Sequence, residues 1–326
     1  MRRLALRRLL ILPVILWAVA TTVWLLMIAL PGDPVRLLAG QSAQPEIVAR
    51  VRADWGFDDP LPVQYARFLG RLVRLDLGYS YLQDRPVSAI LLGHLPATLA
   101  LGLTAMALAL GAGIGLGLIA ALRRGTPVDT ALLVGTLAGV SVPVFWLGLV
   151  LILIFASSHG LGWLPVSGYG DGPKLTPWPG GPLVRLPHPA HLVLPAVTLA
   201  LVSAGGLARL TRSALLDVLG QDYMRAARAR GLPPTRLFGR HALRTALAPV
   251  VTYAGLDLAA LLGGAIATEY VFAWPGLGKV LVRAIHARDL PVVEGSVLLL
   301  TCAFVSVGSL TDLLHAWLIP AAREQA

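Results

Sequence analysis

The sequence predicts an all-α membrane protein with six transmembrane helices and an outward-facing subdomain after the first of them. Of its 326 residues, 56% are hydrophobic and only 13% are charged, whereas a soluble domain carries about a quarter charged residues. Six apolar runs of about twenty residues are each long enough for a helix to cross a bilayer. The predicted spans are Leu9–Leu30, Ala97–Leu122, Ala131–Ala156, Leu192–Leu210, Leu247–Thr268 and Val292–Leu314.

The first apolar run is expected to remain in the protein as a membrane helix. It follows four arginines within the first eight residues and so superficially resembles a secretory signal peptide. However, its 22 residues exceed the roughly 7–15 apolar residues of a signal peptide, and no small-residue cleavage site follows. The mixed segment that comes next, Pro31–Pro96, is interpreted as a small extramembrane subdomain of short helices.

The second and third spans contain residues that influence helix packing. Gly111, Gly113, Gly115 and Gly117 form two overlapping pairs of small residues four apart, and such pairs let helix backbones approach closely. Packing inside this chain is favoured over a dimer interface. In the third span, Pro143 is expected to kink the helix, and the kink either shapes a cavity or fits a neighbouring helix.

Basic residues determine the predicted orientation. One set of connecting segments is rich in arginine, while the other set has few or balanced charges. Because Lys and Arg are enriched in cytoplasmic loops, both termini are expected in the cytoplasm of a multi-pass protein of the cell (inner) membrane. The basic set contains Arg2, Arg3, Arg7 and Arg8, then Arg123 and Arg124, then the seven arginines from Arg212 to Arg244, and Arg323.

The segment between the fourth and fifth spans, residues 211–249, is the most informative part of the chain. From Arg212 to Arg244 it contains seven arginines and two aspartates, so it is too polar to enter the bilayer. Two stretches rich in Ala and Arg flank the break Gly231-Leu232-Pro233-Pro234, which predicts a helix–turn–helix hairpin. A basic, structured hairpin on the cytoplasmic side indicates a docking surface for a soluble protein.

The sequence contains no group of residues with the types and spacing of a known catalytic motif. No zinc-protease or nucleophile-elbow motif occurs, and the seven histidines are scattered. The run Gly276–Lys279 resembles part of a phosphate-binding loop, but Ala273 stands where that loop needs its first glycine and Val280 where it needs Ser or Thr. We therefore expect a non-catalytic subunit without cofactor or metal. The net charge of +10 requires no nucleic acid, because basic cytoplasmic loops account for it.

Few ionisable residues lie within the predicted spans, where each costs roughly 2.5–3.5 kcal/mol on insertion scales. Asp257 lies midway along the fifth span and is the best candidate for a carboxylate that faces a translocation pathway. A structural role, as partner of a hydroxyl or of a helix end, is the open alternative. Arg209 and Asp312 lie near the inner ends of their spans and are expected to reach the cytoplasmic interface.

Two stretches of the hairpin resemble the coupling loop, known as the EAA loop, of permeases in ATP-binding-cassette (ABC) importers. They are Asp222-Tyr-Met-Arg-Ala-Ala-Arg-Ala-Arg-Gly-Leu232 and His241-Ala-Leu-Arg-Thr-Ala-Leu-Ala-Pro249. Arg225 stands where the general pattern has glutamate, and His241 and Arg244 replace its isoleucine and proline. These departures match the variant found in the dipeptide/oligopeptide/nickel permease branch.

Other segments resemble the same branch, in the same order, along almost the whole chain. They are Leu30–Pro34, Trp55–Tyr65, Asp76–Ser80, Arg85–Val87 and Leu95–Thr98, then Leu262–Ala265, Glu269, Phe272 and Trp274–Gly278. The resemblance implies a type I ABC importer permease fold in two parts. Residues 1–94 form the first helix and the outward subdomain, and residues 95–316 form the permease domain with its coupling loop, 211–249.

The resemblance further implies the partners and the cargo. A second homologous permease completes a pathway for di- or oligopeptides, two ABC ATPase subunits bind the hairpin, and a substrate-binding protein acts outside the bilayer. Nickel or another small solute is the alternative cargo. A secondary transporter or channel is the alternative from another class, although no internal repeat supports it.

The implied site residues form two groups. The candidate pathway residues are Asp257 and Glu269. In the hairpin, small alanines would let the helix approach an ATPase closely, and a glycine would adopt the left-handed conformation that ends helices. Arginines would bond acidic ATPase residues or, alternatively, anionic lipid. The coupling-loop residues are Tyr223, Arg225, Ala226, Ala227, Arg228, Arg230, Gly231, Leu232, His241 and Arg244.

Overall fold

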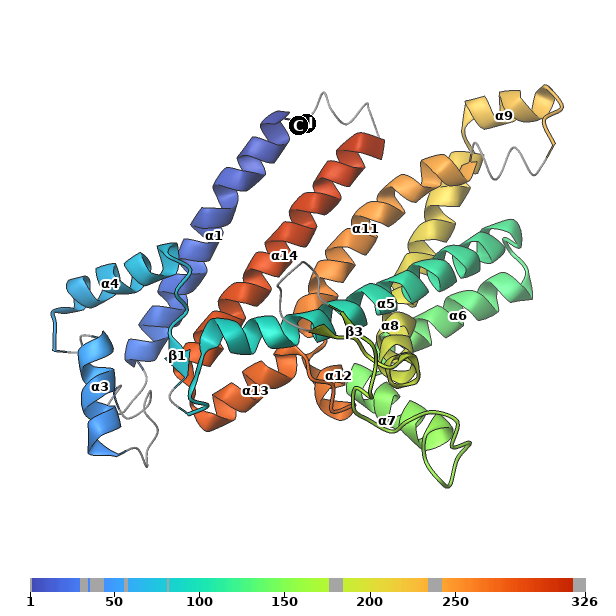
Figure 1. The fold of residues 1–326 in the computed structure, drawn as a ribbon. Coiled ribbons are helices and arrows are strands. Elements are labelled where there is room, and N and C mark those ends of the chain that lie inside the picture. Colours follow the sequence, from blue (N-terminus) through green and yellow to red (C-terminus); the bar gives the residue numbers. More distant parts are fainter. Residues whose placement is uncertain are drawn as a thin grey trace.

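The fold consists of long helices that lie side by side, with short helices at both ends (Figure 1). The computed structural model describes residues 2–29, 35, 44–55, 58–80, 82–175, 184–233 and 242–318. The longer helices are α1 (Arg2–Ala29), α5 (Val87–Leu122), α6 (Pro127–Ser141), α7 (Val144–Phe155), α8 (Pro189–Leu219), α11 (Leu243–Gly264) and α14 (Leu290–Leu318). The shorter helices are α3 (Pro45–Trp55), α4 (Leu61–Val73), α9 (Asp222–Ala229), α12 (Ile266–Val271) and α13 (Leu277–Ala287).

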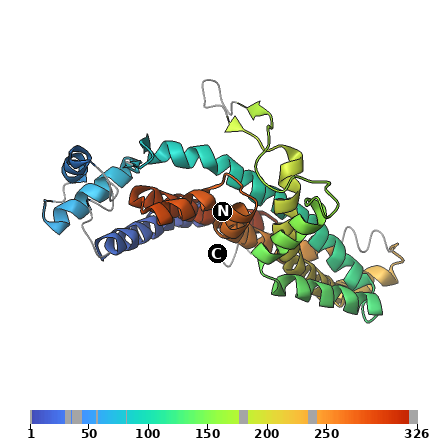
Figure 2. The same ribbon diagram turned by 90° about the horizontal axis from the view of Figure 1, so that it is seen from below.

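Two small antiparallel hairpins complete the described structure. Strand β1 (Tyr79–Ser80) pairs with β2 (Arg85–Pro86), and β3 (Lys174–Leu175) pairs with β4 (Val184–Arg185). Seen from below, α3 and α4 lie at one edge of the molecule and α6 and α7 at the opposite edge (Figure 2).

The helix lengths confirm a membrane protein, with fewer certain spans than the six predicted. Four helices are long and apolar enough to cross a bilayer, at Val87–Leu122, Pro189–Leu219, Leu243–Gly263 and Leu290–His315. A fifth crossing is formed if Pro127–Gly139 and Val144–Phe155, which are bent by 105°, act as one broken span. Helix α1 continues through the first predicted span as far as Ala29.

Pro143 breaks the third predicted span, as expected. Val142 and Pro143 have the extended ψ values of 131° that separate α6 from α7. A proline cannot donate the backbone hydrogen bond that a helix needs, and its ring forces the preceding residue out of the helical region. The kink is therefore a break between two helices rather than a bend within one.

The fifth predicted span was wrong at its C-terminal end. The helix α11 stops at Gly264, and α12 begins at Ile266 after a break at Ala265, so a single helix does not continue to Thr268. Two consecutive glycines, Gly263 and Gly264, weaken the helix at this point because glycine loses the most backbone entropy on ordering.

Helices α5 and α8 form the most extensive helix–helix contact among the described residues. A Cβ added at Gly113 would lie 2.5 Å from Leu207 Cβ, and one added at Gly117 would lie 2.5 Å from the Ala208 carbonyl oxygen. In contrast, Gly111 has no neighbouring atom within 4 Å of such a Cβ. One of the two predicted pairs, Gly113 and Gly117, therefore serves packing within the chain, whereas Gly111 and Gly115 have no such neighbour among the described residues.

The described part of the segment between α1 and α5 contains the short helices α3 and α4, as predicted, and α4 packs on α1 and α14. Phe68 of α4 is buried against Ala20 of α1 and Leu298 of α14. The Tyr65 hydroxyl lies 2.7 Å from the Thr21 hydroxyl. Helix α5 begins at Val87, ten residues before the predicted span, so the expected division between residues 94 and 95 falls inside a continuous helix.

We predict that Gly117→Val destabilises the chain while Gly115→Val does not. The new side chain at position 117 would overlap the α8 backbone, and overpacking of this kind costs about 1–3 kcal/mol. At position 115 no atom lies within 4 Å of an added Cβ. Thermal unfolding of the two purified variants in the same detergent tests this, and equal midpoints would contradict the packing described.

Candidate functional site

The arginine-rich hairpin lies at the far end of α8 and α11, and α9 projects beyond both helices (Figure 1). The start of α1 and the end of α14 lie at the same end of the molecule. Helix α9 begins after Gln221, whose ψ of 152° is extended, and Asp222 lies in its first turn. A carboxylate there is favourable because a helix N-terminus carries partial positive charge.

One face of α9 is part of the chain's own core. Met224 is fully buried and Ala227 is 7% exposed. Both pack with Ala121 of α5, Leu215 of α8 and Ala246 of α11. A displacement of α9 is therefore transmitted to three long helices. The small size of Ala227 serves this internal packing, so the expected approach to an ATPase rests on Ala226 alone.

The other face of α9 is polar and exposed, and among the described residues its one printed link to α8 is the hydrogen bond that Arg225 Nη2 donates to the Gly220 carbonyl at 3.2 Å. Tyr223 is 42% exposed, and Arg225 lies 3.4 Å from Asp222 with both side chains largely in solvent. Such exposed pairs contribute little to stability. The exposed coupling residues in the described part of the hairpin are Tyr223, Arg225, Ala226, Arg228 and Arg230, and Arg244 is exposed in the first turn of α11. His241 lies outside the described residues.

Gly231 ends α9 in the left-handed conformation that the sequence predicts. Its φ is 73°, which costs an L-residue about 1–2 kcal/mol. The Gly231 N–H donates to the Arg228 carbonyl at 3.0 Å, and the Leu232 N–H donates to the Ala227 carbonyl at 3.4 Å. These two bonds are those of a Schellman cap. Leu232 packs against the same cluster as Ala227, so the turn is fixed to the core.

A buried ion pair fixes the end of α8 to α6. The Arg212 Nε donates to Asp129 Oδ1 at 2.7 Å and its Nη2 donates to Oδ2 at 2.8 Å. Asp129 is 4% exposed and also accepts the Gly125 N–H at 3.0 Å. Bidentate pairs of this kind define both distance and orientation. The helix that leads into the hairpin is therefore held against its neighbour just before α9 begins.

A row of polar side chains, the polar seam, follows the line where α8 and α11 meet. It consists of Ser203 and Arg209 on α8 and of Tyr253 and Asp257 on α11. The Ser203 hydroxyl donates to the Asp257 carboxylate, whose Oδ2 has no hydrogen-bond partner among the described residues. Tyr253 is 39% exposed. The predicted pathway residue Asp257 thus belongs to a larger polar group at membrane depth.

Glu269 has the contacts of a helix cap. It is fully buried, its Oε1 accepts the Thr98 hydroxyl at 2.7 Å, and its Oε2 accepts the Lys279 N–H at the start of α13 at 3.0 Å. Burial raises the pKa of this carboxyl, although these hydrogen bonds act to lower it. A Cβ at Gly276 would overlap the carboxylate. The glycine run that resembles a phosphate loop therefore makes room for Glu269, and its role in the pathway stays a prediction.

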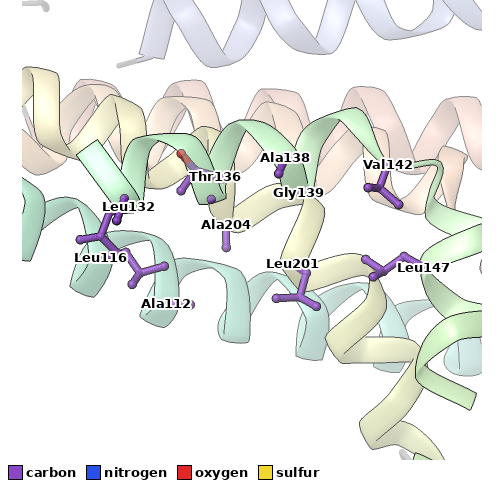
Figure 3. A pocket seen from close by; sticks show the side chains of 13 residues that line it. Ala112, Leu116, Leu132, Thr136, Ala138, Gly139, Val142, Leu147, Leu201 and Ala204 are labelled. Carbon is purple, nitrogen blue, oxygen red and sulfur yellow. The ribbon is translucent and has the colours of Figure 1, made fainter. Parts of the chain in front are cut away.

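A cavity of about 390 Å³ lies between α5, α6, α7 and α8 (Figure 3). Its one polar side chain is Thr136, and that hydroxyl donates to the Leu133 carbonyl at 2.9 Å. The walls thus offer no charge and no free hydrogen-bonding side chain to a polar solute. The polar seam is the better place to look for contacts with cargo.

Comparison with known proteins identifies the family. Residues 113–324 match the model of the binding-protein-dependent transport system inner membrane component, and residues 1–102 match the model of its N-terminal region. The chain belongs to this family of ABC-importer permeases. It is a multi-pass protein of the inner membrane, and as the permease component it is a non-catalytic subunit, as predicted.

Relatives of this permease cover nearly its whole length. It is 41% identical to the di/tripeptide transport system permease protein DppB of Pseudomonas aeruginosa, over 91% of each chain. It is 40% identical to the glutathione transport system permease protein GsiC of Salmonella typhi, over 98% of each chain. A chain of the MetNI methionine ABC transporter, in inward-facing conformations, shares the fold at 19% identity, with a TM-score of 0.50 over 68% of this chain and 93% of that one.

The ion pair of Asp129 and Arg212 is one feature of this permease that could not be predicted from the sequence. A helix start was visible at Thr126-Pro127, since Thr favours the N-cap and Pro the first helical position. An acidic residue in the first turn fits that pattern. However, no spacing along the chain connects position 129 to position 212, which meet only through the packing of α6 on α8.

We predict that Asp129→Asn lowers the thermal stability of the permease more than the double change Asp129→Asn with Arg212→Gln. The single change leaves a charged arginine without its buried partner, while the double change removes both charges. Unfolding midpoints of the wild type, both single variants and the double variant form a cycle that isolates the interaction. Additive effects would show that the pair contributes no coupling.

Proposed function

We propose that this permease imports di- or oligopeptides as one of two homologous permeases in an ABC importer. Its similarity to permeases of di/tripeptide and glutathione transport over almost the entire chain carries this proposal. Members of the family act with ATPase and binding-protein partners, and we assign two ATPase subunits to the hairpin and a binding protein to the opposite face. The described residues hold no group of three or more His, Cys, Asp or Glu that could bind a metal, which favours peptides over nickel.

The distribution of polar groups supports a pathway between two subunits. The cavity inside this chain is apolar, whereas the seam lies beside exposed residues of α11, with Leu256 at 55% and Tyr253 at 39% exposure. Polar side chains at membrane depth avoid lipid and line pathways or pair with one another. We therefore propose that the seam, with Asp257, faces the second permease across the pathway.

The packing of α9 supports its role as the coupling element. The exposed arginines offer charge-assisted hydrogen bonds to acidic residues of an ATPase. Met224 and Ala227 join the helix to α5, α8 and α11, so ATPase closure would tilt these helices together. His241 and Arg244 extend the proposed surface on the second half of the hairpin.

The proposed topology has six crossings, with α1 as the first and the broken pair α6–α7 as the third. Both termini and the hairpin are then cytoplasmic, and the α3–α4 subdomain is outside. The position of α9 at the same end as the start of α1 and the end of α14 supports this arrangement. The division into residues 1–94 and 95–316 stays a prediction.

The topology predicts the reaction of two introduced cysteines with a membrane-impermeant thiol reagent. In a Cys302→Ser background, which removes the single native cysteine, Arg74→Cys in the subdomain should react in intact cells. Arg228→Cys in the hairpin should react only after the membrane is opened. Labelling of position 228 in intact cells would reverse the orientation and reject the proposed ATPase site.

The coupling role predicts that Gly231→Ala lowers peptide uptake while the matched change Gly220→Ala does not. Position 231 has a φ of 73°, which costs alanine about 1–2 kcal/mol, a factor of roughly 5–30 in the population of the correct turn. Gly220 has an ordinary φ of −79° and only normal contacts around an added Cβ.

Uptake of a labelled peptide and co-purification of the ATPase subunits are the two measurements. We expect Gly231→Ala to lose ATPase subunits or to hydrolyse ATP without matching uptake. Normal uptake with a full complement of ATPase would place the coupling element elsewhere in the chain.

A further inference from the structure

The four residues of the polar seam have a fixed order along the axis of α8. Ser203 and Asp257 are hydrogen-bonded and so lie at the same height along this axis, which is called the carboxylate level. The Tyr253 hydroxyl lies over Gly206, where an added Cβ would be 2.5 Å away. Arg209 follows three residues after Gly206 and interacts electrostatically with Tyr253. Since a helix rises 1.5 Å per residue, the carboxylate level and the arginine level are about 9 Å apart.

Neither charge of the seam has an ion-pair partner among the described residues. Asp257 Oδ2 accepts no hydrogen bond from a described residue. No ion pair or hydrogen bond joins the Arg209 guanidinium to any side chain in the described ranges. The two residues are both partly exposed. Because ionisable groups at this depth require polar partners, the part of each side chain that remains exposed is open to a partner outside the chain.

Along the axis of α8, the seam presents first a carboxylate (Asp257), then a hydroxyl (Tyr253) and then a guanidinium (Arg209). A short peptide has the complementary pattern, with an ammonium at one end, amides in the middle and a carboxylate at the other. Extended chain spans about 3.3–3.6 Å per residue, so about 9 Å corresponds to a peptide of roughly three residues. A single carboxylate beside an arginine is a poor site for a divalent cation, which prefers several oxygen or imidazole ligands.

We propose that the polar seam is a transient binding site that holds both ends of a di- or tripeptide during transport. Asp257 binds the amino terminus, Arg209 binds the carboxyl terminus, and the Tyr253 hydroxyl lies beside the peptide backbone. The amino end therefore points toward α12 and the carboxyl end toward the hairpin. This site rests on the proposed peptide import and adds to it a direction of travel and a limit on length.

The test uses a cysteine at Leu256, which is exposed beside Asp257 on α11. The complete transporter, with its ATPase subunits, is prepared in membrane vesicles from a Cys302→Ser, Leu256→Cys chain. We expect a small water-soluble thiol reagent to modify this cysteine. Trialanine should slow the modification. N-acetyl-trialanine and trialanine amide, which each lack one terminal charge, should need about tenfold higher concentrations, because a charge-assisted hydrogen bond is lost.

Two variants give a crossed pattern that a structural role would not produce. Asp257→Asn should abolish the preference for trialanine over its N-acetyl form and keep the preference over the amide. Arg209→Gln should do the reverse. The exposed Asp217→Asn, on the same helix as Arg209, is the matched control and should keep both preferences.

Three results would overturn the site. They are an unreactive cysteine at position 256, equal protection by all three peptides, and equal weakening of all three by Asp257→Asn. ATP-driven uptake of free alanine peptides is measured separately in the wild type. If the wild type takes up these peptides but the two variants do not show opposite losses of preference, only the proposed binding site at the seam is rejected. If no peptide from dialanine to penta-alanine is taken up, the proposal of peptide import is itself rejected.

Discussion

The contact of α5 with α8 is the constraint on which the rest of the structure depends. At Gly113 and Gly117 the two helices approach so closely that no side chain fits between them. Close approach of this kind replaces the hydrophobic effect, which gives little drive for helix association inside lipid. It holds α8 rigidly at membrane depth, and α8 in turn carries parts of every functional feature of this permease.

Those features are arranged along α8 in a single line. Ser203 and Arg209 contribute to the polar seam, Arg212 makes the ion pair with α6, and Leu215 supports the buried face of α9. The proposed cargo contacts of α8 and the residues of α8 that support α9, the proposed ATPase-binding helix, thus lie on one continuous helix of 31 residues. No separate relay between the two sites is needed, because a displacement at one end of a packed helix is a displacement of the whole.

The sequence predicted well those features that depend on local composition. Apolar runs located the long helices, Pro143 located the break in the third span, and Gly231 located the end of α9, because each effect acts on the residue's own backbone. The family resemblance, carried by the hairpin residues, was confirmed by the relatives. The burial of Ala227 against the chain's own core was not predicted, because a small apolar residue occurs on both the buried and the exposed face of a short helix.

Features that depend on distant residues could not be read from the chain. The partner of Asp129 is 83 positions away, and that of Glu269 is Thr98, 171 positions away. The polar seam combines two helices in the same manner, so Asp257 was found from its depth alone while its neighbours Ser203 and Tyr253 were missed. Hydropathy also overestimated the C-terminal end of α11, because it does not register a helix break within an apolar run.

The seam divides its residues between the two helices that the hairpin connects. Helix α8 leads into α9, and α11 follows the hairpin. Because the buried side chains of α9 pack against both α8 and α11, a displacement of α9 would move these two helices together. In the proposed importer, the two charges of the seam would therefore move together while the helices tilt. Such a transporter would change which side of the membrane can reach its cargo without changing how the cargo is held. Release into the cell would then depend on the proposed second permease moving away.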